Sequence, residues 1–200
     1  DGTIPAGTTA YEKRGIAVNV PEWQADNCIQ CNNCAFVCPH ATIRPFALTE
    51  DEAAKAPAST KFAAKPVMKT NYKFTMAVSP LDCMGCTLCV KACPVNNKAA
   101  KDGTDKVALR MVPQATQSEQ QAAWDYAVAN VSEKTELINN TVKGSQFKQP
   151  LLEFSGACPG CGETPYAKLI TQLFGDRMFI ANATGCSSIW GGSAPATPYT

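Results

Sequence analysis

The feature that most constrains this chain is a cysteine pattern that occurs twice. The first copy of C-x2-C-x2-C-x3-C-P runs from Cys28 to Pro39, and the second runs from Cys83 to Pro94. The short steps within each copy allow one loop to bring several thiols around a single metal centre. Most of the eleven cysteines of the chain belong to these two copies, so any account of the chain must begin with them.

The spacing of the repeat is typical of loops that hold 4Fe–4S clusters. In such a pair of loops the first three cysteines bind one cluster, and the cysteine before proline binds the other. One predicted ligand set is therefore Cys28, Cys31, Cys34 and Cys93, and the other is Cys83, Cys86, Cys89 and Cys38. Because the sets exchange their fourth ligands, the two clusters must be close neighbours, and an electron on one can pass to the other.

Two other uses of clustered cysteines explain the pattern less well. Disulfide frameworks are typical of exported proteins, but eleven is an odd number and the N-terminal residues are polar. Zinc loops pair two cysteines with a distant second pair rather than running four together. The small or flexible residues Gly85 and Asn32-Asn33 would let backbone N–H groups point at cluster sulfurs. The doubled pattern therefore favours two iron-sulfur clusters.

The segments that flank each cysteine loop have the β-branched and aromatic content of strands. They are Gly15–Val20 and Thr42–Leu48 around the first loop, and Tyr72–Val78 and Lys106–Met111 around the second. Each half is then expected to run strand, cysteine loop, short helix, strand. Two such halves predict a small α+β domain with pseudo-two-fold symmetry.

The remaining residues of this first domain are expected to cover the repeat. Glu50–Ala58 is a charged helix candidate in a surface insert. Over residues 115–131, apolar residues recur at helical spacing, which predicts an amphipathic packed helix. The polar stretch 132–149 is interpreted as a linker. We therefore divide the chain into a first domain, residues 1–145, and a second, residues 146–200.

The second domain has its own cysteines and a helical pattern. Its cysteines are Cys158, Cys161 and Cys186. Thr164 as N-cap and Pro165 at the first helical position predict a helix that Gly175 ends. The apolar stripe of this helix consists of Tyr166, Leu169, Ile170, Leu173 and Phe174. Met178–Ala183 reads as a short buried strand, and a helix followed by a buried strand is typical of an α/β layer with a parallel sheet.

Composition argues against several function classes. The 18 basic and 17 acidic side chains leave a formal net charge of +1, and no basic run is long enough to follow a nucleic-acid backbone. No window approaches the roughly 20 apolar residues that span a bilayer. We therefore expect no nucleic-acid or membrane partner and a cytoplasmic location. Since the chain lacks an initial Met and ends in a Pro/Ala/Thr stretch, we expect it to be part of a longer protein.

Two parts of the chain resemble known families. Residues 16–112 resemble the dicluster bacterial ferredoxins through the doubled cysteine pattern. The segments CPGCGETPYAKLI and NATGCSSIWGG resemble the start of the thiamine-diphosphate-binding domain of the pyruvate:ferredoxin oxidoreductases. The resemblance covers essentially the whole chain. It implies a dicluster ferredoxin-like domain followed by the beginning of an α/β thiamine-diphosphate-binding domain.

The resemblance also implies further cofactors. Cys158, Cys161 and Cys186 would hold a third 4Fe–4S cluster, completed by a cysteine outside this segment. Glu163 and Cys186 would lie against thiamine diphosphate, which binds with Mg²⁺ in the full protein. An acidic side chain beside an anionic cluster is otherwise costly, so a polar cofactor group is a natural partner for Glu163. Gly175-Asp176-Arg177 is not the Gly-Asp-Gly…Asn motif that binds the metal and diphosphate, and we interpret it as an ordinary turn.

The family reaction converts pyruvate and coenzyme A to acetyl-CoA and carbon dioxide, and thiamine acts as the electron sink. Two electrons would leave one at a time through three clusters to ferredoxin or flavodoxin, in what is expected to be a homodimer. Three alternatives stay open. They are a redox-active disulfide between Cys158 and Cys161, a non-catalytic electron-transfer subunit, and an oxidoreductase for another 2-oxoacid. The substrate and coenzyme A sites are expected outside this segment.

A few other residues carry weaker signals. For His40, the only histidine, a surface or packing role is favoured over tuning of the nearby cluster. The tryptophans Trp23, Trp124 and Trp190 are interpreted as core or interface aromatics. Lys91 could face a partner protein, although a single lysine is usually just solvated.

Overall fold

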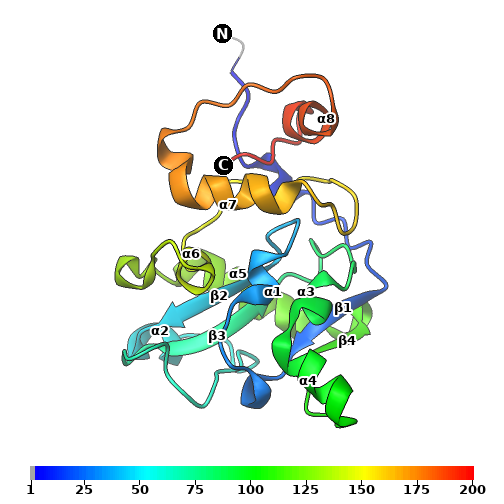
Figure 1. The fold of residues 1–200 in the computed structure, drawn as a ribbon. Coiled ribbons are helices and arrows are strands. Elements are labelled where there is room, and N and C mark those ends of the chain that lie inside the picture. Colours follow the sequence, from blue (N-terminus) through cyan, green and yellow to red (C-terminus); the bar gives the residue numbers. More distant parts are fainter. Residues whose placement is uncertain (1–2) are drawn as a thin grey trace.

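The computed structural model describes residues 3–200, so the first two residues of the predicted first domain lie outside the described part (Figure 1). The α-helices are α1 Asn33–Phe36, α2 Glu50–Ala54, α3 Leu88–Ala92, α4 Pro94–Asp102, α5 Ser118–Asn130, α6 Val142–Ser145, α7 Thr164–Phe174 and α8 Cys186–Gly192. The strands are β1 Asn19–Trp23, β2 Ile43–Leu48, β3 Lys73–Val78 and β4 Leu109–Pro113. Short 3-10 helices are η1 Thr8–Tyr11, η2 Ala25–Asn27, η3 Gln114–Thr116, η4 Thr135–Leu137 and η5 Gly175–Arg177. No helix within residues 3–200 has both the length and the apolar character that a bilayer crossing requires.

The strands form two antiparallel pairs, and each pair joins the two halves of the repeat. β1 precedes the first cysteine loop and pairs with β4, which follows the second loop, so that Val20 lies opposite Val112. β2 follows the first loop and pairs with β3, which precedes the second, so that Phe46 lies opposite Thr75. The predicted α+β unit with strands around each loop is confirmed. β1 and β4 begin a few residues later than composition indicated, because their pairing sets their limits.

The main apolar core joins the strands to the cysteine loops. Phe74 of β3 is fully buried, and its ring centroid lies 5.8 Å from that of Trp23 and 6.4 Å from that of Phe147. Both contacts are edge-to-face, a favourable geometry for aromatic rings. The same cluster of buried side chains includes Cys34 and Cys89. The cysteine loops are therefore part of the core and are held rigidly by it.

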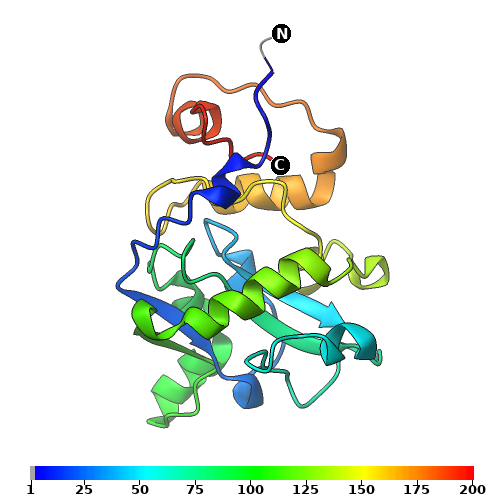
Figure 2. The same cartoon turned by 180° about the vertical axis from the view of Figure 1, so that it is seen from behind.

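Helix α5 crosses the strands on the face seen in Figure 2. Its Trp124 is buried, and the ring packs edge-to-face against Phe46 at 6.4 Å and Phe154 at 6.3 Å. The helix predicted over residues 115–131 is confirmed over residues 118–130, with Trp124 and Ala127 buried, whereas Val128 of the predicted apolar face is 46% exposed. All three tryptophans are buried, in agreement with their prediction as core aromatics.

The stretch 132–149, predicted as a linker, is instead packed against the first domain. Leu137 and Phe147 are buried and belong to the main core. Lys134 Nζ donates to both carboxylate oxygens of Glu52 in α2, at 3.0 and 2.9 Å. The linker prediction was wrong because the polar composition of the stretch hides two widely spaced apolar residues that reach the core.

The N-terminal segment passes beside the C-terminal end of the chain, near α7 and α8 (Figure 1). The Gly7 N–H donates to the Tyr199 carbonyl at 2.7 Å. The Thr9 hydroxyl donates to the Glu153 carbonyl at 2.8 Å. Residues 3–10, which the sequence assigned to the first domain, therefore pack against the end of the second.

Residues 178–183, predicted as a buried strand, form no regular structure and are largely exposed. Within residues 3–200 no strand pairs with this segment, so its backbone groups have no ladder to join. The strand prediction was wrong because a continuous apolar run becomes a strand only where a partner strand exists. The parallel sheet expected to start here is likewise not formed within the described residues.

Helix α7 buries its polar face and exposes its apolar face, which is the opposite of a usual amphipathic surface helix. Its apolar residues Tyr166 and Ile170 are 69% and 45% exposed. Its polar residues Thr164, Lys168 and Thr171 are buried against the rest of the molecule. A surface helix normally turns its apolar stripe to the core, so polar contacts must hold α7 in place.

Candidate iron-sulfur site

The two cysteine loops follow the same backbone path. Gln30 in the first loop and Gly85 in the second occupy matching positions, and both have left-handed backbones with φ of 57° and 69°. Asn32 and Thr87 match in the same way, with φ of 63° and 65°. L side chains rarely adopt this conformation, so its recurrence at paired positions confirms that the sequence repeat is also a structural repeat.

The left-handed residues direct backbone N–H groups toward the thiols. The Gln30 N–H donates to Cys28 Sγ at 3.3 Å, and the Gly85 N–H donates to Cys83 Sγ at 3.4 Å. At Gly85 a Cβ atom would lie only 3.0 Å from the carbonyl oxygen of Asn19. The left-handed angle favours glycine at this position, and the close neighbours of Gly85 leave no room for the side chain that Gln30 carries in the first loop.

One group of thiols contains the three leading cysteines of the first loop and Cys93 from the second. Burial raises the pKa of Cys28, and the neighbouring thiols of Cys31 and Cys93 raise it further. Burial also raises the pKa of Cys34 well above its usual value, with Cys89 and the thiols of this group adding to the effect. Because Cys89 belongs to the other loop's group, the two groups adjoin.

The second group contains the three leading cysteines of the second loop and Cys38 from the first. Burial raises the pKa of Cys83 to about 12, and the thiols of Cys38 and Cys86 contribute to the rise. Burial raises the pKa of Cys89 as well, beside the same three thiols. All four side chains line one small cavity. The fold thus brings together the two sets that the sequence predicted, including the exchange of the fourth members.

These thiols suit a positively charged metal centre. A thiol whose pKa is raised by burial stays protonated at neutral pH, so a thiolate there needs a cationic partner. No three His, Cys, Asp or Glu side chains in residues 3–200 lie close enough to hold one metal ion. Iron-sulfur cubes use such converging thiolates in apolar surroundings.

The loop from Cys158 to Cys161 is seated on the second group of thiols. A Cβ atom on Gly160 would lie 3.7 Å from Cys86 Cβ. Burial raises the pKa of Cys86, and backbone N–H groups that include that of Gly160 partly offset the rise. His40 is buried and its Nε2 lies 3.3 Å from the Cys158 carbonyl oxygen. His40 is thus a buried residue rather than a surface one, and it lines the same cavity as the second group of thiols.

Cys161 lies at the N-terminal end of α7. Burial alone would raise the pKa of its thiol, but hydrogen bonds from Thr164 and Glu163 lower it on balance. The Glu163 N–H donates to Cys161 Sγ at 3.4 Å. The helix begins at Thr164, and Glu163 stands at the N-cap position that was predicted for Thr164. The difference arises because the cysteine sulfur, rather than a threonine hydroxyl, accepts from the free N–H groups.

Cys186 begins the short helix α8 and is exposed. Helix α8 is linked to the start of α7 by Trp190, whose Nε1 donates to Glu163 Oε2 at 3.4 Å. Glu163 itself is exposed. Within residues 3–200, Cys186 does not form a tight group of three metal-ligating side chains with Cys158 and Cys161. The role of these three cysteines therefore stays a prediction.

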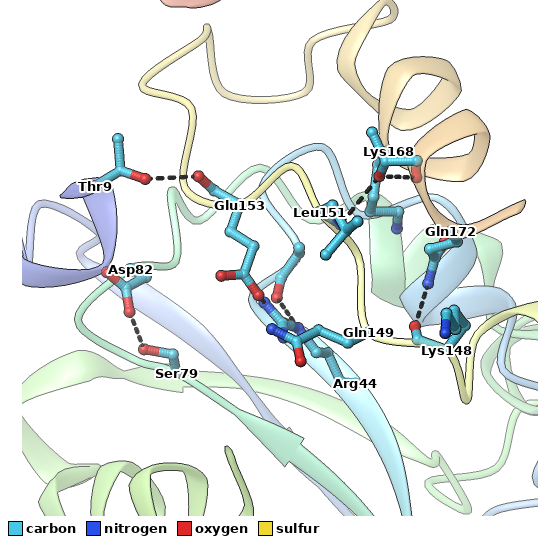
Figure 3. A network of polar contacts seen from close by, with 12 residues as sticks. Thr9, Arg44, Ser79, Asp82, Lys148, Gln149, Leu151, Glu153, Lys168 and Gln172 are labelled. Carbon is cyan, nitrogen blue, oxygen red and sulfur yellow. Dashed lines mark hydrogen bonds and ion pairs between the residues drawn. The ribbon is translucent and has the colours of Figure 1, made fainter. Parts of the chain in front are cut away.

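Sequence reasoning missed a set of buried charges between the two parts of the chain (Figure 3). Arg44 of β2 pairs with Glu153, and both side chains are only 9% exposed. The buried Lys168 Nζ donates to the carbonyl oxygens of Ala35 and Phe36. The available signal was the polar face of α7, in which hydrophilic residues recur at helical spacing opposite the apolar stripe.

Comparisons with known proteins fit this geometry. Residues 27–97 match the 4Fe-4S dicluster domain family. The chain is 58% identical over 201 residues to pyruvate-flavodoxin oxidoreductase of Enterobacter agglomerans and 56% identical over 204 residues to pyruvate:ferredoxin oxidoreductase of Moorella thermoacetica. Each alignment covers 100% of this chain and 16% of the relative.

A third relative differs in the electron acceptor that its name gives. The chain is 52% identical over 201 residues to pyruvate dehydrogenase (NADP+) of Cryptosporidium parvum, covering 100% of this chain and 10% of the relative. The chain thus spans only 10–16% of the length of these curated relatives. Over its full length, the chain is therefore recognised as a segment of the pyruvate-flavodoxin and pyruvate:ferredoxin oxidoreductase family.

Proposed function

We propose that this chain relays single electrons through two 4Fe–4S clusters inside a longer 2-oxoacid oxidoreductase. The observation that carries the proposal is the exchange of cysteines between loops, since Cys93 lies with the first loop's thiols and Cys38 with the second's. Crossed fourth ligands are the arrangement that paired clusters use. The proposed ligand sets are Cys28, Cys31, Cys34 and Cys93 for one cluster, and Cys83, Cys86, Cys89 and Cys38 for the other.

We propose that Cys158, Cys161 and Cys186 hold a third 4Fe–4S cluster together with a cysteine from outside this chain. Two observations support it. The lowered pKa of Cys161 favours the thiolate that a cluster needs, and the loop that carries it contacts Cys86 through Gly160. Electrons then enter the dicluster domain at the second group of thiols. They leave at the first group, where Ile29 is 60% exposed beside Cys28.

For the whole protein we propose oxidation of pyruvate with coenzyme A to acetyl-CoA and carbon dioxide, in a cytoplasmic homodimer. The names of the relatives support pyruvate as substrate and a flavodoxin or ferredoxin as acceptor. Thiamine diphosphate with Mg²⁺, when bound, supplies the electron sink. A reducing compartment suits a chain whose cysteines serve as metal ligands.

Glu163 is the residue of this chain that we propose beside thiamine diphosphate. Its carboxylate is exposed, lies at the start of α7 next to Cys161, and is oriented by the hydrogen bond from Trp190. It therefore fits a polar cofactor group that approaches the third cluster from outside.

The clusters are tested by composition and by two matched substitutions. The whole protein, prepared anaerobically, should hold about eight iron and eight sulfide per chain from these two cubes. The third cube should add about four iron and four sulfide. Cys38→Ser should chiefly perturb the EPR signal of the cluster held by the second loop. Cys93→Ser should chiefly perturb the signal of the cluster held by the first loop. Stoichiometric zinc, or loss of the cluster of the substituted loop itself, would contradict the crossed assignment.

The thiamine assignment is tested with Glu163→Gln in the whole protein, after its iron content has been checked. We expect weaker binding of thiamine diphosphate and slower pyruvate-dependent reduction of the clusters. Unchanged affinity and unchanged reduction would remove Glu163 from the cofactor site. Failure of the unaltered protein to bind thiamine diphosphate with Mg²⁺ would favour a non-catalytic electron-transfer subunit.

A further inference from the structure

One charged side chain from α7 is buried against the first cysteine loop. Lys168 lies on the inner face of the helix, and only 2% of its surface is exposed. Its Nζ donates to the carbonyl oxygens of Ala35 and, at 3.2 Å, of Phe36. These two residues lie between Cys34 and Cys38 in the chain. The ammonium group therefore rests on the segment that joins two cluster ligands.

Lys168 lies near one ligand of each of the two proposed cluster sets. The Ala35 carbonyl also accepts the N–H of Cys38 at 3.2 Å, so the ammonium and the Cys38 backbone share one acceptor. Burial lowers the pKa of Lys168 to about 8, while the thiols of Cys38 and Cys34 act in the opposite direction. Cys34 belongs to one proposed set and Cys38 to the other. One cation thus rests on the short segment that joins a ligand of each cluster.

Lys168 has no carboxylate partner in the part of the chain that the structure describes. The buried carboxylate of Glu153 pairs with Arg44 instead. Carbonyl oxygens satisfy the hydrogen bonds of the ammonium, but they carry no net charge to balance it. A buried cation without a counter-charge is costly. Within residues 3–200, the thiols of Cys38 and Cys34 favour the charged form of Lys168, whereas the nearby Arg44 guanidinium opposes it.

We propose that Lys168 is the counter-charge of the cluster pair and raises the reduction potentials of both clusters. The proposal rests on the cluster assignment made above. Thiolate-bound cubes are anionic and become more negative on reduction, so a fixed cation beside their ligands favours the reduced state. The low dielectric of the buried site strengthens the effect. Since α7 begins three residues after Cys161, the helix that starts at the third site also sets the charge balance of the other two.

Three substitutions in the whole, anaerobically prepared protein test this role. Lys168→Gln removes the charge and keeps a hydrogen-bond donor, whereas Lys168→Arg keeps the charge. Gln172→Leu is the matched control, because Gln172 lies on the same buried face and donates to the Lys148 carbonyl at 2.9 Å without carrying charge. EPR-monitored redox titration should show both clusters at lower potential in Lys168→Gln. The potentials of the other two variants should stay close to those of the unaltered protein.

Iron content separates this proposal from the cluster assignment. If the unaltered protein lacks the iron of two cubes, the assignment itself fails. If iron is present and Lys168→Gln has unchanged potentials, the counter-charge role is overturned. Should Lys168→Gln lose iron, retention by both Lys168→Arg and Gln172→Leu supports the need for charge. Loss of iron in either of those two variants would instead show that the interface has only a structural role.

Discussion

Residues 16–113 and residues 150–200 differ in which side chains they bury. The first region encloses apolar residues such as Phe74 and Val78, which are fully buried between strands and cysteine loops. In the second region, α7 buries Thr164 and Lys168 and exposes Ile170. The dicluster region is therefore stabilised mainly by burial of apolar surface. Helix α7 of the second region is held mainly by polar contacts, and Phe154 adds an apolar contact with Trp124. Substitutions in the two regions should differ accordingly.

The largest effect is expected from truncating the centre of the apolar core. Phe74→Ala removes the ring between Trp23 and Phe147 and should lower the free energy of unfolding by about 4–5 kcal/mol. Anaerobic urea titration would measure the loss, and the cysteine loops should release iron at lower urea. A loss below about 1 kcal/mol would show that the core does not stabilise the dicluster region.

A slightly smaller effect is expected at the buried ion pair between the two regions. Glu153→Gln leaves the Arg44 guanidinium without its partner carboxylate and should cost about 3–4 kcal/mol. The double variant Arg44→Met with Glu153→Leu serves as control, because replacing both charges by apolar groups is expected to cost less than removing one. If the double variant is less stable than Glu153→Gln, the ion pair makes a net contribution to stability beyond neutralising its own two buried charges.

A third substitution tests the polar attachment of the stretch 132–149. Partial burial alone would raise the pKa of Glu52, but hydrogen bonds from Ser132, Thr49 and Lys134 outweigh it and lower the pKa from 4.5 to about 2. Glu52→Gln should therefore cost about 2 kcal/mol. A carboxyl with a lowered pKa contributes fully above pH 4.5 and loses its contribution as pH falls through about 2. The cost measured by urea titration should thus be the same at pH 6 and pH 8, and a change between them would contradict this account.

The smallest effect is expected on the exposed stripe of α7. Ile170→Ser should change the free energy of unfolding of this chain by no more than about 0.5 kcal/mol, because the side chain is 45% exposed. Thr171→Val on the buried face removes the hydroxyl that accepts the Leu151 N–H at 3.1 Å, and it should be the more destabilising of the two. The reverse order would show that α7 packs through its apolar stripe after all.

The cysteine loops were predictable because their chemistry is local and repeated. The spacing specified the loops and the pairing of Cys38 and Cys93 with the opposite loop. The two antiparallel pairs then follow from the need to bring such loops together. A pattern read along the chain captures features of this kind well.

The features that sequence reasoning missed depend on the rest of the fold. Residues 178–183 have the composition of a strand, yet only a partner strand could make them one. Leu137 and Phe147 are core residues in a stretch whose composition is polar. In the sequence, Lys168 is a single lysine on a predicted helix. Its burial follows from the way α7 lies on α1. In each case the neighbour that decides the outcome is distant in sequence.

The interlocked strand pairs have a consequence for how the protein is made. β1 ends at Trp23, but its partner β4 begins only at Leu109, so the ribosome must synthesise both cysteine loops before that pair can close. The first loop likewise waits for Cys93 to complete its proposed ligand set. Long-range pairing of this kind slows folding, and an unfinished chain exposes reactive thiols in the meantime. Cluster insertion is therefore expected to follow synthesis of the whole domain, which makes timely delivery of iron and sulfide a condition for its folding.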